Sequence, residues 1–230
     1  MKIKHLKVVP NSENQKVGGA ACTYRPIGMN ACGSCPSTCG IYKECYGRNG
    51  FVRYTEQRTR TSQDDLEAIA TACKSHVRHN VTGDVFVNDK LDVEYVNEII
   101  AFHKRHPHIT GWLYCHRIRD WDDAGFTADT IPTNLFIMAS CDKDEEVEYA
   151  REHGWRYART TMKQNARKVN NEVYCPFDMA KENGALIADI NLSCVTCKIC
   201  FEGEVNVVFM LQDSTKYLER WKNRKPKVAA

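Results

Sequence analysis

Residues 134–160, NLFIMASCDKDEEVEYAREHGWRYART, contain one complete unit of the pattern that decides the fold. The continuous apolar run at residues 134–140 is typical of a strand buried on both faces. Three acidic residues at 144–146 then load the first turn of a predicted helix, where the helix dipole favours negative charge, and this helix ends near Gly154. Residues 155–160 predict the next strand. Such a strand–helix–strand unit predicts two parallel strands joined by a crossover helix.

The same alternation extends along the chain on both sides of this unit. Ser62 and Asp65 form a capping-box pattern that predicts a helix over residues 62–77. Apolar residues at helical spacing predict another helix at residues 93–100, which Pro107 stops. Further strands are predicted at residues 20–25, 79–87, 109–116 and 205–211. About five strand–helix units result, so we expect an α/β fold, a partial (βα)5-6 TIM-like barrel with mostly parallel strands.

Composition narrows the class of protein. The chain has 230 residues, of which 43% are hydrophobic and 27% charged, which excludes a disordered or collagen-like protein. This length allows a large core, so a disulfide-stapled mini-protein is excluded as well. Lys and Arg number 32 against 29 Asp and Glu, and the formal net charge of +3 does not by itself indicate nucleic-acid binding. We expect one α/β domain over residues 1–230, with a cysteine-rich cluster loop at 18–60 and a cysteine-rich C-terminal segment at 174–202.

The sequence also indicates the cellular compartment in which the protein is expected. The longest fully apolar run, residues 207–211, is far shorter than the ~20 residues of a membrane-spanning helix. Residues 1–16 are charged and lack the apolar core of a secretory signal. We therefore expect a cytoplasmic protein with reduced thiols and no membrane partner.

Cysteine is the unusual feature, with 12 residues, and the first cluster is CGSCPSTCGIYKECY at residues 32–46. Four thiols separated by Gly, Pro and Ser can surround one metal centre, because the loop has no regular structure that would prevent it. The spacing matches neither paired zinc motifs nor the ferredoxin run, so it leaves the metal open. The fourth ligand also stays open between Cys22, Cys32, a cofactor and none.

A second cluster, CVTCKIC at residues 194–200, is preceded by Cys175 and Pro176. Spacers of two residues let three thiolates point at one centre, as they do in ferredoxins. Soft thiolates suit both iron–sulfur clusters and zinc, and we favour iron–sulfur because only one side of the site offers the paired spacing typical of zinc. The predicted metal ligands are Cys175, Cys194, Cys197 and Cys200. The thiols predicted to be ordinary core residues are Cys73, Cys115 and Cys141.

Several of these motifs together resemble a known pattern. They are CPSTCGIYKECYGRNG at residues 35–50, TGD at 82–84, YCH at 114–116, and the closing Cys175-Pro176 with C-x2-C-x2-C at 194–200. This order resembles a family of uncharacterised cysteine-rich bacteriophage proteins. That family is similar to radical S-adenosylmethionine (radical SAM) proteins, in which a loop after the first strand of a partial (βα)6 barrel supplies three thiolates to a [4Fe-4S] cluster.

The resemblance implies roles for individual residues. Cys35, Cys39 and Cys45 would hold three irons and leave the fourth open to S-adenosylmethionine. Tyr42 would stand where the family has an aromatic residue near the adenine, although most members space their thiols C-x3-C-x2-C and this chain has five residues in the second gap. By the same likeness, the C-terminal thiols would hold a second, fully ligated cluster.

Other polar residues follow predicted strands, where sites gather in α/β folds. Asp84, at a Gly-Asp turn, is a candidate for binding a cofactor through an amine or a ribose hydroxyl, and an Asx turn or a helix cap is the alternative. His116 and Arg117 end the next predicted strand and could face the same edge, although a solvated or paired residue is the commoner outcome.

Three functions compete. The first is a radical SAM-like enzyme with an unknown substrate and a reductant such as a ferredoxin or flavodoxin. The second is a non-catalytic iron–sulfur protein for electron transfer or binding, which the five-residue gap favours. The third is a zinc-stabilised adaptor for nucleic acid or protein, using the arginine and aromatic residues at 48–60. A phage origin would place the protein in the host cytoplasm, and the substrate and the oligomeric state stay open.

Overall fold

The computed structural model describes residues 6–29, 33–40, 42, 45–48, 65–161, 171–185 and 191–210. Its strands are β1 (Lys7–Val9), β2 (Ala21–Tyr24), β3 (His76–Arg78), β4 (Phe86–Val87), β5 (Lys90–Leu91), β6 (Thr110–Cys115), β7 (Leu135–Cys141), β8 (Arg156–Thr161), β9 (Glu172–Tyr174) and β10 (Asn206–Met210). Its helices are the 3-10 helix η1 (Tyr46–Arg48), α2 (Glu67–Thr71), α3 (Val93–Arg105), α4 (Ile118–Asp123), α5 (Asp144–Glu152), α6 (Pro176–Glu182) and α7 (Cys194–Cys197). None of these helices is long and apolar enough to cross a membrane.

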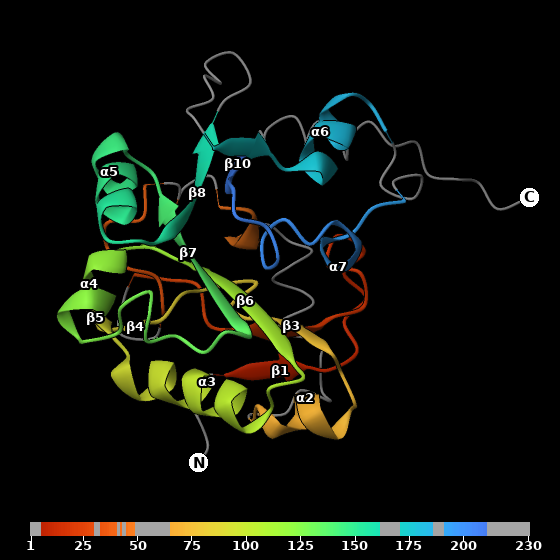
Figure 1. Ribbon diagram of the computed structural model, residues 1–230, viewed down its shortest axis with the longest axis horizontal. Coiled ribbons are helices and arrows are strands. Elements are labelled where there is room, and N and C mark those ends of the chain that lie inside the picture. Colours follow the sequence, from red (N-terminus) through yellow and green to blue (C-terminus); the bar gives the residue numbers. More distant parts are fainter. Residues whose placement is uncertain are drawn as a thin grey trace, which may run out of the picture.

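Most of the strands form one sheet. Its order is β1-β2-β3-β6-β7-β8-β10-β9, and β4 pairs with β5 in a separate hairpin. β1 is antiparallel to β2, whereas every other neighbouring pair in the large sheet is parallel. From β2 to β8, neighbours in the sheet also follow one another along the chain, apart from the β4–β5 hairpin (Figure 1). The expected α/β class with mostly parallel strands is therefore confirmed.

The sheet has two apolar faces because side chains alternate along each strand. In β6, Leu113 and Cys115 belong to the larger core, together with residues of helices α2 to α5. Trp112 lies on the opposite face and packs against Phe201, with 4.9 Å between the ring centroids. Helices α2 to α5 flank one side of the strands, whereas α6 and α7 lie on the other side (Figure 1). Helices α2 to α5 thus cover one face, and cysteine-rich segments that contain α6 and α7 cover the other.

The decisive strand–helix–strand unit is confirmed as β7, α5 and β8. The helix predicted at residues 93–100 is the first part of α3, which Asp92 caps by accepting the Tyr95 N–H at 3.1 Å. α3 ends at Arg105, just before Pro107, as predicted. The strands predicted at residues 20–25, 109–116 and 205–211 are confirmed as β2, β6 and β10.

The helix predicted over residues 62–77 is wrong for most of its length. Residues 62–64 lie outside the described residues, and the helical part of the remainder is α2 alone. Cys73 has a left-handed backbone with φ 51°, which cannot continue an α-helix, and Val77 already belongs to β3. Cys73 was also expected in the core, but it is exposed because it lies in this turn after α2.

The strand predicted at residues 79–87 is also wrong for most of its length. Only β4 is extended in this region, and a buried loop precedes it. The left-handed backbone of Asn80, with φ 49°, interrupts a regular strand there, although the Val81 N–H still donates to Thr23 O at 2.8 Å. Side-chain bonds add to this backbone pairing, since the Asn80 N–H donates to Thr23 Oγ1 at 2.9 Å and Thr82 Oγ1 donates to Arg25 O at 3.3 Å. Apolar residues such as Val81 are buried in this loop without belonging to a strand.

A pair of fully buried histidines connects α3 to the sheet. His103 Nδ1 lies 3.1 Å from Ile109 O, and His103 Nε2 lies 3.0 Å from His79 Nε2. Burial lowers the pKa of His103 to about 4, and burial followed by the neighbouring imidazole lowers the pKa of His79 well below its usual value. Gly111 of β6 lies against this pair, because a Cβ at this position would stand 2.2 Å from His103 Nε2.

We expect Gly111→Ala to lower the free energy of unfolding by about 1 to 3 kcal/mol, because the new methyl group must displace a buried, hydrogen-bonded ring. Urea unfolding followed by circular dichroism measures this loss. His103→Ala removes the ring, so the double variant should lose less stability than the sum of the two single variants. Strictly additive losses would contradict the steric explanation.

Candidate metal centres

The N-terminal loop, residues 33–48 as far as they are described, lies at the carboxyl edge of the parallel strands. Ser34 Oγ accepts the Asp84 N–H at 2.9 Å, and Asp84 lies in the loop that follows β3. Further along, the Gly40 N–H donates to Asp142 Oδ2 at 2.7 Å, and Asp142 directly follows β7. This edge is where binding and catalytic sites gather in α/β folds.

His116, directly after β6, is held between two carboxylates at this edge. Its backbone N–H and its Nδ1 lie 3.0 and 2.9 Å from Asp84 Oδ2, and its Nε2 lies 3.4 Å from Asp142 Oδ2. Burial opposes protonation of His116, but hydrogen bonds to Asp142 and Asp84 outweigh it and raise the pKa well above its usual value. The Cys39 sulfur, a His116 ring nitrogen and an Asp142 oxygen all lie within 4.8 Å of one another, a donor group able to hold a metal ion.

The other two predicted thiols of the loop share this neighbourhood. Burial above all raises the pKa of Cys35 to about 11, and the charges of Asp84, Cys39 and Cys45 add to the rise. Burial also raises the pKa of Cys45, which Cys39 raises further and His116 lowers. Charges shift the pKa of a neighbouring thiol in this way only over short distances, so these groups lie near one another. A metal that binds here must displace protons from these thiols.

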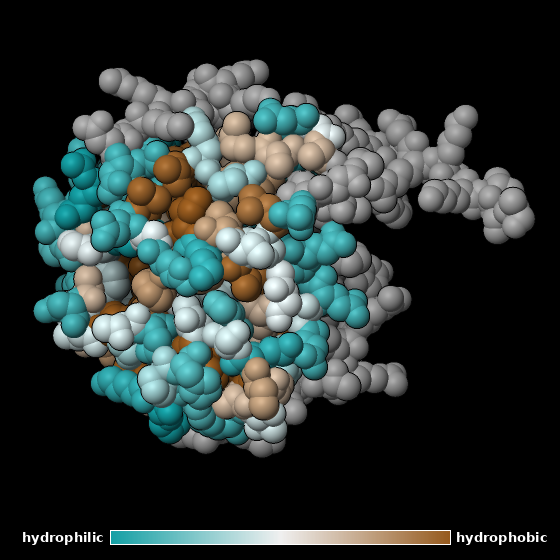
Figure 2. All heavy atoms as spheres, turned by 45° about the vertical axis from the view of Figure 1, so that its right-hand side comes forward, coloured by the Kyte–Doolittle hydropathy of each residue, from teal (hydrophilic) through white to brown (hydrophobic). Residues whose placement is uncertain are grey.

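The structure also brings together the four cysteines predicted for the C-terminal centre. They line one pocket, the C-terminal pocket, between the sheet and helices α6 and α7. Its lining includes Cys175, Cys194, Cys197, Cys200, Lys16, Arg78, Tyr114, Phe177, Ile199, Val207 and Phe209. Hydrophobic residues reach the surface among hydrophilic ones on the side of the molecule that carries these two helices (Figure 2). Apart from its thiols, its two cations and Ser193, the pocket is lined mostly by apolar and aromatic side chains.

The short helix α7 sets the spacing of three of these thiols. Ser193 caps its N-terminus and begins the turn on which Cys194 and Cys197 lie three residues apart, on one side of the helix. Lys198 then has φ 63°, a left-handed conformation that ends the helix and turns the chain so that Cys200 also lines the pocket. Local backbone geometry thus explains why all three thiols reach the same space.

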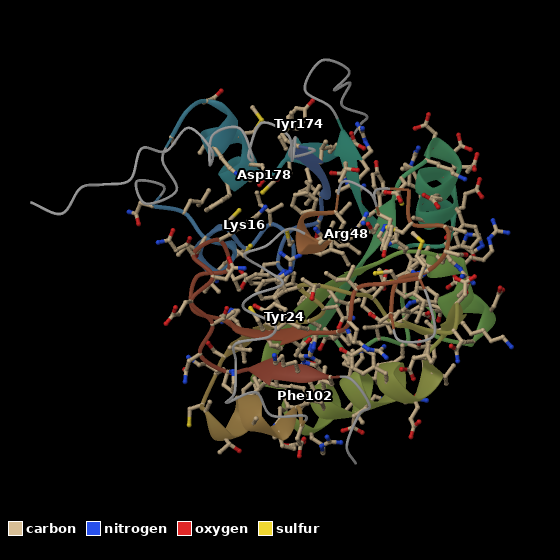
Figure 3. The ribbon with its side chains drawn as sticks, turned by 180° about the vertical axis from the view of Figure 1, so that it is seen from behind. Lys16, Tyr24, Arg48, Phe102, Tyr174 and Asp178 are labelled. Atoms are coloured by element: carbon tan, nitrogen blue, oxygen red, sulfur yellow. The ribbon has the colours of Figure 1, made fainter. Side chains whose placement is uncertain are left out.

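Two cations face these thiols. Lys16 Nζ donates to Asp178 Oδ1 at 2.6 Å and lies 5.0 Å from the ring centroid of Phe209, and Figure 3 shows Lys16 beside Asp178. Burial raises the pKa of Cys194 to about 12, and the positive charge of Arg78, followed by that of Lys16, opposes this rise. The same two cations would offset the negative charge of thiolates bound to a metal.

Not every candidate joins these two groups. Cys22 packs in the apolar cluster that contains Cys194 and Cys200, which places it beside the C-terminal pocket. Cys32 lies outside the described residues. The thiols found buried, as predicted for core residues, are Cys115 and Cys141.

The two candidate cofactor-binding residues already have partners within the chain. The Arg48 guanidinium lies 4.7 Å from the ring centroid of Tyr42 and donates to Tyr42 O at 3.3 Å. Asp84 Oδ1 accepts the Val85 N–H at 2.8 Å, while its Oδ2 binds His116. Residues 49–60 of the arginine and aromatic stretch lie outside the described residues.

Sequence reasoning missed Asp142 and Lys16, and it gave His116 no definite role. His116 and Asp142 each come directly after a buried parallel strand, and this position is the signal that could have indicated them. Lys16 offers no such signal, because it reaches the C-terminal pocket from a loop far away in the sequence.

Comparison of the chain with protein-family models, with curated proteins and with solved structures finds no match in any of the three. The fold and the two groups of thiols define an α/β protein with two candidate metal centres. Its function must therefore be argued from the chemistry of these centres.

Asp84→Ala should lower the free energy of unfolding by about 2 to 4 kcal/mol, because it leaves the half-buried His116 imidazole and two backbone N–H groups without their acceptor. Asp89→Asn is the control, because Asn tolerates the left-handed backbone of Asp89, with φ 59°. Asp89 also accepts bonds from Ser37 and Arg117, but its exposed side chain should contribute less than about 1 kcal/mol. Urea unfolding compares the two, and equal losses would contradict a structural role for Asp84.

Proposed function

We propose that this chain is an iron–sulfur protein in which Cys175, Cys194, Cys197 and Cys200 hold a [4Fe-4S] cluster. The observation that carries the proposal is the convergence of these four thiols on one pocket. A [4Fe-4S] cluster, when bound, supplies one-electron transfer at a potential set by its surroundings. Soft thiolates in the C-x2-C-x2-C arrangement favour iron–sulfur over zinc, which more often takes two separate pairs of cysteines.

The surroundings of the pocket support a cluster. Four thiolates give the cluster a net negative charge, which is costly to bury among apolar side chains. Lys16 and Arg78 supply positive charge beside the thiols, and the Lys16 ammonium is fixed by Asp178. The aromatic rings of Phe177 and Phe209 line the same pocket and limit the access of water. The chain thus provides both the ligands and the electrostatic compensation that a buried cluster needs.

The N-terminal loop supplies a second centre in this proposal, with Cys35, Cys39 and Cys45 as ligands. These three thiols lie in a neighbourhood that also contains His116. Two [4Fe-4S] clusters would explain why the chain has so many cysteines besides those buried in its hydrophobic core. As an iron–sulfur protein with reduced thiols it would act in the cytoplasm, or in the host cytoplasm if it is encoded by a bacteriophage.

A second candidate is a radical SAM-like enzyme. The observation that favours it is the order of β2, β3, β6, β7 and β8, which are parallel and consecutive, with a three-thiol loop at their carboxyl edge. We infer from this order a partial (βα)5-6 TIM-like barrel, from which the position of β10 between β8 and β9 departs. Tyr42 and Asp84 would then lie near the S-adenosylmethionine, and a reductant such as a ferredoxin or flavodoxin would be the partner.

Iron and acid-labile sulfide, counted in protein purified without oxygen, test the first candidate. For two [4Fe-4S] clusters we expect about eight iron atoms per chain and a brown protein that absorbs light at ~400 nm. Cys200→Ser and Cys39→Ala should each remove about half of the iron, because each removes a ligand from a different centre. Cys73→Ser changes an exposed thiol outside both centres and should leave the iron unchanged. Colourless protein that contains zinc would favour the zinc-stabilised adaptor for nucleic acid or protein.

Titration of the loaded protein with S-adenosylmethionine tests the second candidate. A radical SAM-like enzyme should release or absorb heat on binding and should change the electron paramagnetic resonance spectrum of the reduced N-terminal cluster. Both responses should disappear in Cys39→Ala and persist in Cys200→Ser. A loaded protein that gives neither heat nor a spectral change is an iron–sulfur protein without this cofactor.

A further inference from the structure

His116 presents one ring nitrogen to the thiols of the N-terminal loop. Its Nδ1 is occupied by Asp84, and its Nε2 lies on the other side of the ring, 3.3 Å from Ser140 Oγ and 3.4 Å from Asp142 Oδ2. On this side the Cys39 sulfur joins a His116 nitrogen and an Asp142 oxygen within 4.8 Å. The imidazole therefore faces the position where Cys39 would bind a metal.

Asp84 fixes both the orientation and the tautomer of this ring. The carboxylate is 3% exposed, and its Oδ2 accepts both the backbone N–H and Nδ1–H of His116. With one proton held on Nδ1 by Asp84, Nε2 is the ring nitrogen that can bind a metal, once the metal displaces the Nε2 proton and its contacts with Ser140 and Asp142. Metal-binding histidines are held in this way by a carboxylate on the other ring nitrogen. Asp84 itself is anchored by Ser34 of the cysteine loop, so the ring and the loop share one support.

The other residues that could supply a fourth ligand to the N-terminal thiols fit less well than His116. Asp142 already accepts the Gly40 N–H at 2.7 Å, and a carboxylate is a hard ligand that suits Mg²⁺ or Ca²⁺ better than a centre with three thiolates. Cys22 packs in the cluster beside the C-terminal pocket. An imidazole suits both iron and zinc, and it completes a set of three sulfurs and one nitrogen.

We propose that His116 Nε2 is the fourth protein ligand of the N-terminal centre, together with Cys35, Cys39 and Cys45. This inference rests on the proposed function, because it assigns a ligand to the centre proposed there. Four protein ligands leave no coordination position open for a cofactor or a substrate. The N-terminal centre then transfers electrons or stabilises the fold, and the likeness to radical SAM proteins extends to the thiol loop but not to the chemistry. Asp84 is the positioning residue for this ligand.

Labelling with ¹⁵N-histidine tests the assignment in the full-length protein, purified without oxygen. A nitrogen ligand couples to the reduced cluster, and pulsed electron paramagnetic resonance detects this coupling and its change on exchange of ¹⁴N for ¹⁵N. We expect the coupling in the unaltered protein and in His108→Gln, which changes an exposed histidine. It should be absent from His116→Gln. His116→Cys should keep the iron, because a thiolate replaces the imidazole, and should show no nitrogen coupling.

The outcomes separate this inference from the function on which it rests. A cluster bound at the N-terminal thiols that shows no nitrogen coupling in the unaltered protein overturns the role of His116 and leaves the iron–sulfur proposal standing. Zinc at this centre with three sulfurs and one nitrogen, seen by X-ray absorption and lost in Cys39→Ala, supports the ligand assignment and overturns the iron–sulfur proposal there. An unchanged metal content in Cys39→Ala overturns the N-terminal centre, and with it the role of His116, whereas the C-terminal cluster stands or falls with the iron content of Cys200→Ser.

Discussion

The structure depends on one constraint, which is that its sheet has two apolar faces and the helices α2 to α5 cover only one of them. α3 and its neighbours bury the face that carries Leu113 and Cys115. The face that carries Trp112 and Met138 must also be kept from water, and the segments that pack there include Phe177 and Phe201. These segments contain little regular structure of their own, so they gain less from backbone hydrogen bonding than a helix does. A metal centre that joins their cysteines would compensate for this.

The two candidate centres occupy different parts of the sheet, and the N-terminal one follows from the direction of the strands. Because the strands from β2 to β8 are parallel, the residues that follow them meet at one edge, and Asp84, His116 and Asp142 come from three different strand ends. The C-terminal pocket lies instead against the face of the sheet that carries Trp112, and Tyr114 and Val207 form part of its wall. One centre is thus held by polar contacts at an edge, and the other by apolar packing on a face. We expect the first to respond to changes in charge and the second to changes in core volume.

Sequence reasoning succeeded where periodicity was strong and failed where it was weak. The apolar run of β7 and the acidic start of α5 indicate their structures without help from the rest of the chain. Between residues 65 and 87 most apolar residues are buried in a short helix, a short strand and a loop, and the left-handed backbone of Asn80 interrupts the regular strand there. The short elements β1, α4, β9 and α6 were not predicted, because a few residues carry too little periodicity to distinguish a strand from a turn.

The sequence by itself determined the α/β class, the mostly parallel direction of the main strands and the two groups of clustered thiols, because hydrophobic period and cysteine spacing are local properties. Only the tertiary structure decided that Lys16 and Arg78 face the thiols of the C-terminal pocket and that His116 stands beside Cys39. These contacts connect residues that are far apart in the chain. The distances between these residues depend on how the sheet brings the loops together, and a local sequence pattern does not contain this information.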